Sequence, residues 1–108
     1  MLDSTIKVVE PVGILDGTKA GQLRAQVNET MGNGADIILI DLSGITFMDS
    51  SGLGGLVSAL KDVRLAGGRL CVCSLNDQVR ILFELTSMDK VFEIYENRTL
   101  FERTAFRH

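Results

Sequence analysis

Histidine is almost missing from this 108-residue sequence: His108, the last residue, is the only one. A serine nucleophile usually needs a histidine base that an acid orients. A residue at the very end of a chain is rarely held in such a fixed arrangement. The G-x-S-x-G pattern of many hydrolases is also absent, because Met48 and Asp49 precede Ser50. The sequence therefore argues against a serine hydrolase.

Clustered positive charge and long apolar runs are lacking too. The formal net charge is −3, and acids and bases are mixed along the chain. A nucleic-acid surface would need Lys and Arg gathered together. No apolar segment reaches the roughly 18 residues that span a bilayer, and "MLDSTIKVVEP" is acidic where a signal peptide is basic. We expect no nucleic-acid partner, no membrane partner and no signal peptide.

Cysteine is scarce, and its spacing is informative. Cys71 and Cys73 lie two apart in "LCVCS", which reads as a strand. Side chains at that spacing share a face but diverge, so a disulfide between them would be strained. Zinc would need two more ligands. We predict two buried free thiols, typical of a reducing cytoplasm, and no metal or other cofactor.

The chain length suits one domain, residues 1–108. Periodicity and turn residues predict strands at 4–9, 12–15, 36–41, 69–74 and 90–96, and helices at 16–34, 51–66, 76–88 and 99–106. Asp16 or Thr18 is expected to cap the first helix. From residue 12 onward strands and helices alternate, which is the order of an α/β fold.

This order predicts a compact α/β domain with a four-to-five-stranded, mostly parallel (mixed) sheet and about four helices. Segments 37–40 and 70–73 are continuous apolar runs, so we expect them as adjacent central strands. The first strand is expected to pair antiparallel with the second through a turn at Pro11.

A cluster of glycines stands at the start of the second helix, in "DSSGLGGLV". A P-loop would need a lysine after its last glycine, and none follows here. The dinucleotide motif is a closer match, but Val57 stands at its third glycine and "LSGITFMD" separates the motif from the strand. Neither phosphate-binding loop is favoured.

These glycines weaken the helix, by about 1 kcal/mol for each interior glycine. One interpretation is local: Ser50 or Ser51 caps the helix and the glycines allow close packing. The other is that a small-residue face, formed by Gly54, Gly55, Ser58 and Ala59, lets a partner approach. A phosphate on a serine there would suit the helix N-terminus but disturb a partner.

"DLSGITFMDSSGLGGLVSALKDV" and "GGRLCVCSLNDQVRILFELTSMDKVFEIYEN" closely resemble the STAS domain of bacterial anti-sigma factor antagonists. The upstream "GILDGTKAGQLRAQV" resembles that family's G-x-L-D-x-x-x-A-x-x-L segment. The likeness runs from about residue 5 to about residue 104. It implies a βα domain without catalytic activity of its own.

The resemblance further implies a partner switch. The unphosphorylated protein would bind an anti-sigma factor, a serine-protein kinase, and so release the sigma factor. The kinase would phosphorylate Ser50, directly after Asp49, and a metal-dependent serine phosphatase would reverse the step. The expected partner surface is Asp16, Thr18, Asp49, Ser50, Ser51, Gly52, Leu53 and Gly54.

Two points stay open at the sequence level. The same fold also occurs as a non-phosphorylated scaffold or a ligand-binding subunit, in lipid transporters or stress-sensing assemblies. We expect a monomer or a weak dimer, with Leu53 or Phe47 as exposed contacts between copies.

Overall fold

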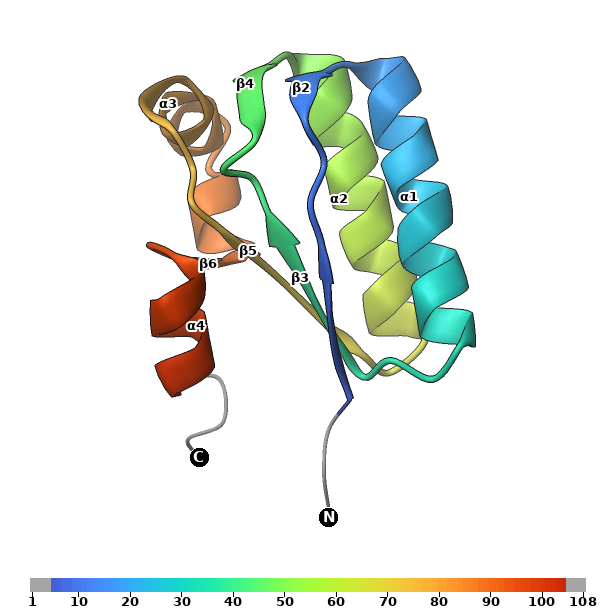
Figure 1. Cartoon of the computed structure of the whole chain (residues 1–108). Coiled ribbons are helices and arrows are strands. Elements are labelled where there is room, and N and C mark those ends of the chain that lie inside the picture. The colour runs from blue at the N-terminus through green and yellow to red at the C-terminus, as the bar shows by residue number, and fades with distance from the viewer. Residues whose placement is uncertain (1–4, 105–108) are drawn as a thin grey trace.

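The computed structural model describes residues 5–104 (Figure 1). Its elements are, in chain order, β1 (Ile6–Val9), β2 (Gly13–Leu15), α1 (Gly17–Gly32), β3 (Ile37–Asp41), β4 (Ile45–Met48), α2 (Ser50–Leu65), β5 (Arg69–Cys73), α3 (Asp77–Leu85), the 3-10 turn η1 (Met88–Lys90), β6 (Glu93–Tyr95) and α4 (Arg98–Thr104). The expected α/β class is confirmed. The ends of the predicted 1–108 domain, and residues 105 and 106 of the last predicted helix, lie outside the described range.

Four strands form the main sheet, in the order β1-β3-β5-β6, and every pairing in it is parallel. The two apolar runs are adjacent central strands, as predicted, with Ile38 beside Leu70 and Ile40 beside Val72. Ile38, Ile40 and Val72 are fully buried on one face of the sheet, and Leu39 and Cys71 are fully buried on the other, as expected of central strands that are covered on both faces.

A second sheet pairs β2 with β4, also in parallel. The predicted antiparallel pairing of the first two strands is therefore wrong. The chain does not reverse at Pro11; β2 continues in the direction of β1, and β4 continues from β3 beside it (Figure 1). The two strand pairs are joined where Gly13 N donates to Gly44 O over 2.9 Å. β1 pairs instead with β3, which is buried at every residue and has β5 on its other side.

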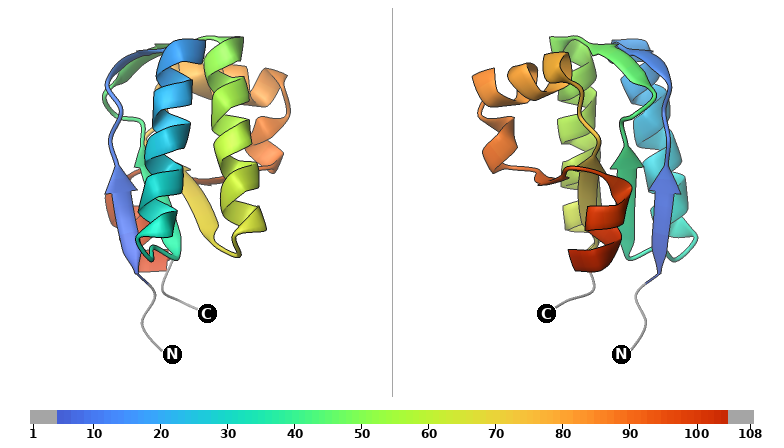
Figure 2. Two further views of the ribbon diagram at one scale, coloured as in Figure 1. Left: turned by 90° about the vertical axis from the view of Figure 1, so that its right-hand side faces the viewer. Right: turned by 60° about the vertical axis from the view of Figure 1, so that its left-hand side comes forward.

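The helices cover the two faces of the main sheet unequally. α1 and α2 pack side by side on one face (Figure 2), and α3 adds Val79 and Phe83 to the same core. The other face has a smaller core of Ile37, Leu39, Cys71, Cys73 and Phe101, which α4 covers. Both cysteines are buried and free, as predicted. Within residues 5–104 no helix is long and apolar enough to cross a bilayer.

Candidate functional site

The starts of α1 and α2 lie next to each other, because the strands that precede them are paired. Leu15, the last residue of β2, is in register with Met48, the last residue of β4. The backbone N–H of Asp49 donates to the carbonyl of Leu15 over 3.3 Å. Asp16 and Asp49 therefore follow the two strands directly and lie at the same edge of this small sheet. This edge is the carboxyl end of parallel strands, where open α/β sheets usually bind their ligands.

Each of these aspartates caps its helix. Asp16 Oδ1 accepts a hydrogen bond from Lys19 N (2.9 Å), and Asp49 Oδ1 accepts one from Gly52 N (2.7 Å). The expected cap at Asp16 is confirmed. The expected cap at Ser50 or Ser51 is wrong, because Asp49 has the extended backbone of a cap residue and α2 begins at Ser50.

The hydroxyl-bearing residues of this edge face solvent. Ser50, Ser51 and Thr18 are all exposed. Because Asp49 Oδ1 already accepts from Gly52 N, neither serine side chain is needed as the cap of α2. Ser51 lies against α1: a Cβ atom added to Gly17 would be 3.3 Å from its Cβ. Ser50 is the first residue of α2 and is exposed to solvent.

The glycines of α2 fall into two groups. A Cβ atom on Gly52 would lie 2.0 Å from the carbonyl oxygen of Leu15, and one on Gly55 would lie 2.4 Å from the Cβ of Ala20. Both positions are closed by β2 and α1. A Cβ on Gly54 would meet nothing within 4 Å. The idea of one small docking face is therefore wrong for Gly55, which packs on α1, and for Ala59, which is fully buried. It stays open for Gly54.

Apolar side chains reach solvent beside the serines. Ile14 and Phe47 are neighbours across β2 and β4, and they are 56% and 46% exposed. The expectation of an exposed Phe47 is confirmed. The expectation of an exposed Leu53 is wrong, because this residue is 4% exposed and belongs to the main core.

Two amide side chains of the α3 start, which the sequence analysis did not single out as functional, hold the other edge of β4. Gln78 Oε1 accepts from Met48 N, and Gln78 Nε2 donates to Met48 O, both over 2.8 Å. Asn76 Nδ2 donates to Ile45 O over 3.1 Å. No local signal in the sequence marks these bonds, because they join residues about thirty positions apart.

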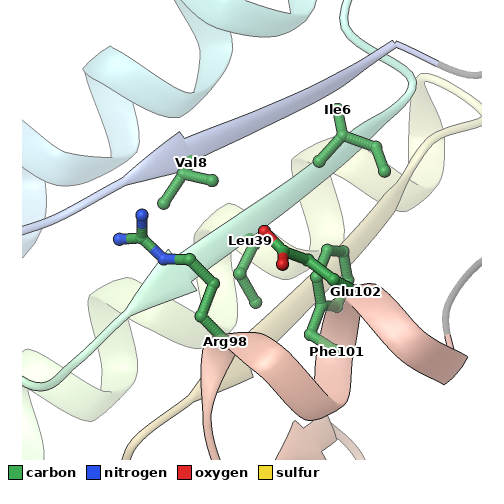
Figure 3. Close-up of a pocket in the computed structure, with 6 residues that line it drawn as sticks. All are labelled: Ile6, Val8, Leu39, Arg98, Phe101 and Glu102. Carbon is green, nitrogen blue, oxygen red and sulfur yellow. The ribbon is translucent and has the colours of Figure 1, made fainter.

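A separate apolar cavity of about 380 Å³ lies on the α4 face of the main sheet, between β1 and α4 (Figure 3). Arg98 stands at its rim and pairs with Glu10 and with Asp41, the latter over 2.8 Å. Burial would raise the pKa of Asp41, but hydrogen bonds from Ser43 and Arg98 hold that pKa below its ordinary value. None of the residues that line this cavity belongs to the edge where α1 and α2 begin, so the cavity is separate from Ser50 and Ser51.

Metal chemistry has no evident place in the described part of the chain. Residues 5–104 contain no group of three or more His, Cys, Asp or Glu side chains arranged to hold an ion.

Comparison with known proteins gives the family. The STAS domain model matches residues 3–100. The chain belongs to the STAS domain family. A curated STAS relative, the anti-sigma F factor antagonist of Paenibacillus polymyxa, is 31% identical over 93 residues, which cover 85% of this chain and 80% of that protein.

Solved STAS structures give the same fold. An anti-sigma factor antagonist from Mycobacterium paratuberculosis is 25% identical, covers 100% of this chain and 91% of its own, and superposes with a TM-score of 0.80. The antagonist SpoIIAA in its unphosphorylated form is 21% identical, covers 97% and 92% of the two chains, and has a TM-score of 0.75. SpoIIAA of Bacillus has also been solved in a phosphorylated form.

Proposed function

We propose that this STAS domain is an anti-sigma factor antagonist whose binding to a partner is switched by phosphorylation of Ser50. In its unphosphorylated form it binds an anti-sigma factor that is also a serine-protein kinase, and so releases the sigma factor. A serine phosphatase restores the binding form. The curated Paenibacillus relative is named an anti-sigma F factor antagonist, which supports the antagonist part of the proposal.

The observation that carries the proposal is the position of Ser50. The residue is exposed, it is the first residue of α2, and the capping aspartate precedes it. A phosphate there adds about −1.5 to −2 charges. The helix dipole and the free N–H groups of the first turn favour an anion, so the fold keeps its stability. SpoIIAA, solved in both forms, is a relative in which phosphorylation and this fold coexist.

The effect on a partner is the opposite. A phosphate beside the Asp49 carboxylate gathers negative charge in the centre of the contact surface. A partner fitted to a neutral hydroxyl would have to desolvate that charge without a matching cation. Phosphorylation then removes the partner without unfolding the domain, as a reversible switch requires.

The proposed contact surface follows the edge where the two helices begin. Its exposed polar members are Asp16, Thr18, Ser50 and Ser51, with the half-buried Asp49 between the helices. Ile14 and Phe47 supply the apolar contact that a stable interface needs. Gly54 leaves room for the partner's backbone. Gly52 and Leu53 are buried, so they do not contact the partner. Gly52 packs against Leu15 and Leu53 packs in the main core, and both thereby hold the start of α2 in place.

The decisive experiment is phosphorylation by candidate kinases from the same genome, with ATP, followed by intact mass. We expect one phosphate on the wild type and none on Ser50→Ala. Ser51→Ala is the matched control, because it removes the neighbouring exposed hydroxyl; it should still accept one phosphate. Labelling that survives Ser50→Ala and disappears in Ser51→Ala would move the switch by one residue.

Binding tests the second half of the proposal. Titration calorimetry with the cognate kinase should show weaker binding by Ser50→Asp than by the wild type, while the two melting temperatures stay close. Equal affinities would remove the switch. A small molecule that copurifies, with no phosphate transfer to any serine, would favour the scaffold or ligand-binding alternative.

A further inference from the structure

The outer edge of β4 lacks a neighbouring strand in the described structure, yet its backbone is buried at the last residue. In a parallel pair, successive residues direct their N–H and C=O groups to opposite sides. Asp49 N donates toward β2, so the N–H and C=O of Met48 point away from β2, toward α3. Met48 is 1% exposed. Both of its backbone groups therefore need a partner within the protein.

The side chain of Gln78 supplies both partners. Its amide oxygen accepts from Met48 N, and its amide nitrogen donates to Met48 O, each over 2.8 Å. A primary amide thereby replaces the peptide group of a missing third strand. Gln78 is itself well fixed, because it lies in the first turn of α3, which Asn76 caps through a 2.9 Å bond from Val79 N.

From these contacts we infer that Gln78 is a positioning residue for Ser50; the inference rests on the proposed function. Met48 is held by Gln78 from one side, and the next residue, Asp49, is held by Leu15 from the other. The Asp49 side chain then fixes the first turn of α2 through Gly52. Ser50 lies inside this chain of bonds, two residues beyond Met48.

Such fixation matters for phosphoryl transfer, in which the protein mainly positions the attacking oxygen in line with the leaving group. A Ser50 backbone that samples several positions would still meet the kinase, but it would present the hydroxyl correctly for less of the time. Loss of Gln78 should therefore lower kcat for phosphorylation more than it changes KM.

The test compares three variants. Gln78→Leu keeps the bulk and removes both hydrogen bonds. Gln78→Glu keeps the shape and can accept from Met48 N, but an ionised carboxylate cannot donate to Met48 O. Asn76→Ser is the matched control: it loses the bonds to the first part of β4 but keeps a good cap for α3. Melting curves confirm that each variant is folded.

Two measurements are made on each protein. Steady-state phosphorylation by the cognate kinase gives kcat and KM. Amide hydrogen exchange of the free protein at Met48 and Asp49 reports the order of the segment without any partner. For Gln78→Leu we expect kcat to fall about tenfold, KM to stay within about twofold and exchange to accelerate. Gln78→Glu should lie between Gln78→Leu and the wild type, and Asn76→Ser should stay close to the wild type.

The inference is overturned if Gln78→Leu keeps the wild-type kcat, or if Asn76→Ser loses kcat to the same extent, since that would indicate general loosening around α3. Failure of the proposed function looks different: the wild type itself would take no phosphate on Ser50. Faster exchange in Gln78→Leu would then support the role of Gln78 in holding the segment and remove only its link to phosphorylation.

Discussion

The starts of α1 and α2 are two versions of one local design. Each follows a short strand of the same parallel pair, and each is capped by an aspartate with almost the same backbone: φ −104° and ψ −173° at Asp16, φ −99° and ψ 178° at Asp49. In each, the aspartate accepts from the N–H three residues later. Both helix starts therefore offer the same dipole and the same kind of free N–H groups.

The residues placed on this common backbone differ. After its cap α1 has Gly17, where a side chain would crowd Ser51, whereas α2 has the exposed Ser50. At the third position α1 has Lys19, whose Nζ donates to Val12 O over 3.1 Å. α2 has Gly52 at that position, packed against the carbonyl group of Leu15. A helix N-terminus alone does not distinguish the two. The difference is at the first helical position, where α2 has the exposed hydroxyl of Ser50 and α1 has Gly17.

The largest effect is expected where that packing is tightest. Gly52→Ala would place a methyl group 2.0 Å from the Leu15 carbonyl oxygen, and backbone cannot move aside as a flexible side chain can. We expect a loss of about 3 kcal/mol or more in the free energy of unfolding, or no folding. Urea denaturation gives the value.

Lys19→Ala is the matched control for Gly52→Ala, since it changes the corresponding position of α1. It removes one exposed hydrogen bond and should lower stability by about 1 kcal/mol or less. Similar stabilities of Gly52→Ala and the wild type would show that β2 can shift, and that the glycine is not required by packing.

This packing also shows what the sequence could and could not predict. Continuous apolar runs such as residues 37–40 report burial directly, so the central strands were evident from the sequence. β4 was not predicted because only its two end residues, Ile45 and Met48, are buried. This pattern matches neither the two-residue period of a strand nor the 3.6-residue period of a helix. The roles of Gly52 and Gly55 depend on Leu15 and Ala20, more than thirty positions away, which no local pattern reports.

A second pair of glycines sharpens the comparison at the level of binding. Gly21 and Gly54 occupy the same position in their helices, and a Cβ atom on either would meet nothing within 4 Å. Gly54→Leu should weaken binding of the cognate kinase about tenfold or more by bulk at the centre of the surface. It should not lower stability, because leucine is the better helix former by about 0.8 kcal/mol. Calorimetry and a melting curve give both values.

Gly21→Leu is the control, with the same gain in helix propensity, and its effect on kinase binding should be smaller. Equal losses of affinity would place both helix starts fully in the interface. Unchanged affinity of Gly54→Leu would remove this part of the proposed surface, and a large loss of stability would show that the site is less open than it is in the structure.

The capping residues Asp16 and Asp49 should contribute equally to the free energy of unfolding but unequally to the phosphorylation of Ser50. Asp16→Ala and Asp49→Ala each remove one side-chain acceptor from a first-turn N–H, so each should lower the free energy of unfolding by about 1 kcal/mol. Only Asp49→Ala loosens the turn that presents Ser50, so only this variant should lower kcat for phosphorylation, whereas Asp16→Ala removes an exposed member of the contact surface and should act on KM. Equal kcat values in the two variants would show that the cap of α2 does not contribute to the switch.

The smallest effect on stability is expected from the ion pair between Arg24 and Asp62, which joins α1 to α2 away from their N-terminal ends. Arg24 of α1 binds Asp62 of α2 through Nε (2.6 Å) and a terminal nitrogen (3.1 Å), and Asn28 adds a third hydrogen bond (2.9 Å). The hydrogen bonds from Arg24 and Asn28 lower the pKa of Asp62 from 3.8 to about 2. A carboxyl group whose pKa is lower in the folded protein stabilises the fold above its unfolded pKa. That contribution is lost as the pH falls through the folded pKa.

The stability difference between wild type and Asp62→Ala should therefore be constant above about pH 5 and shrink between about pH 4 and pH 2. It should be small throughout, and smaller in high salt, because the pair is near the surface. Arg24→Ala is the partner control: in that background Asp62→Ala should have little further effect, and its pH dependence should flatten. Urea denaturation of the four proteins from pH 2 to pH 7 gives these differences. A difference that does not change with pH would mean that Asp62 joins α1 and α2 by packing and not by its charge.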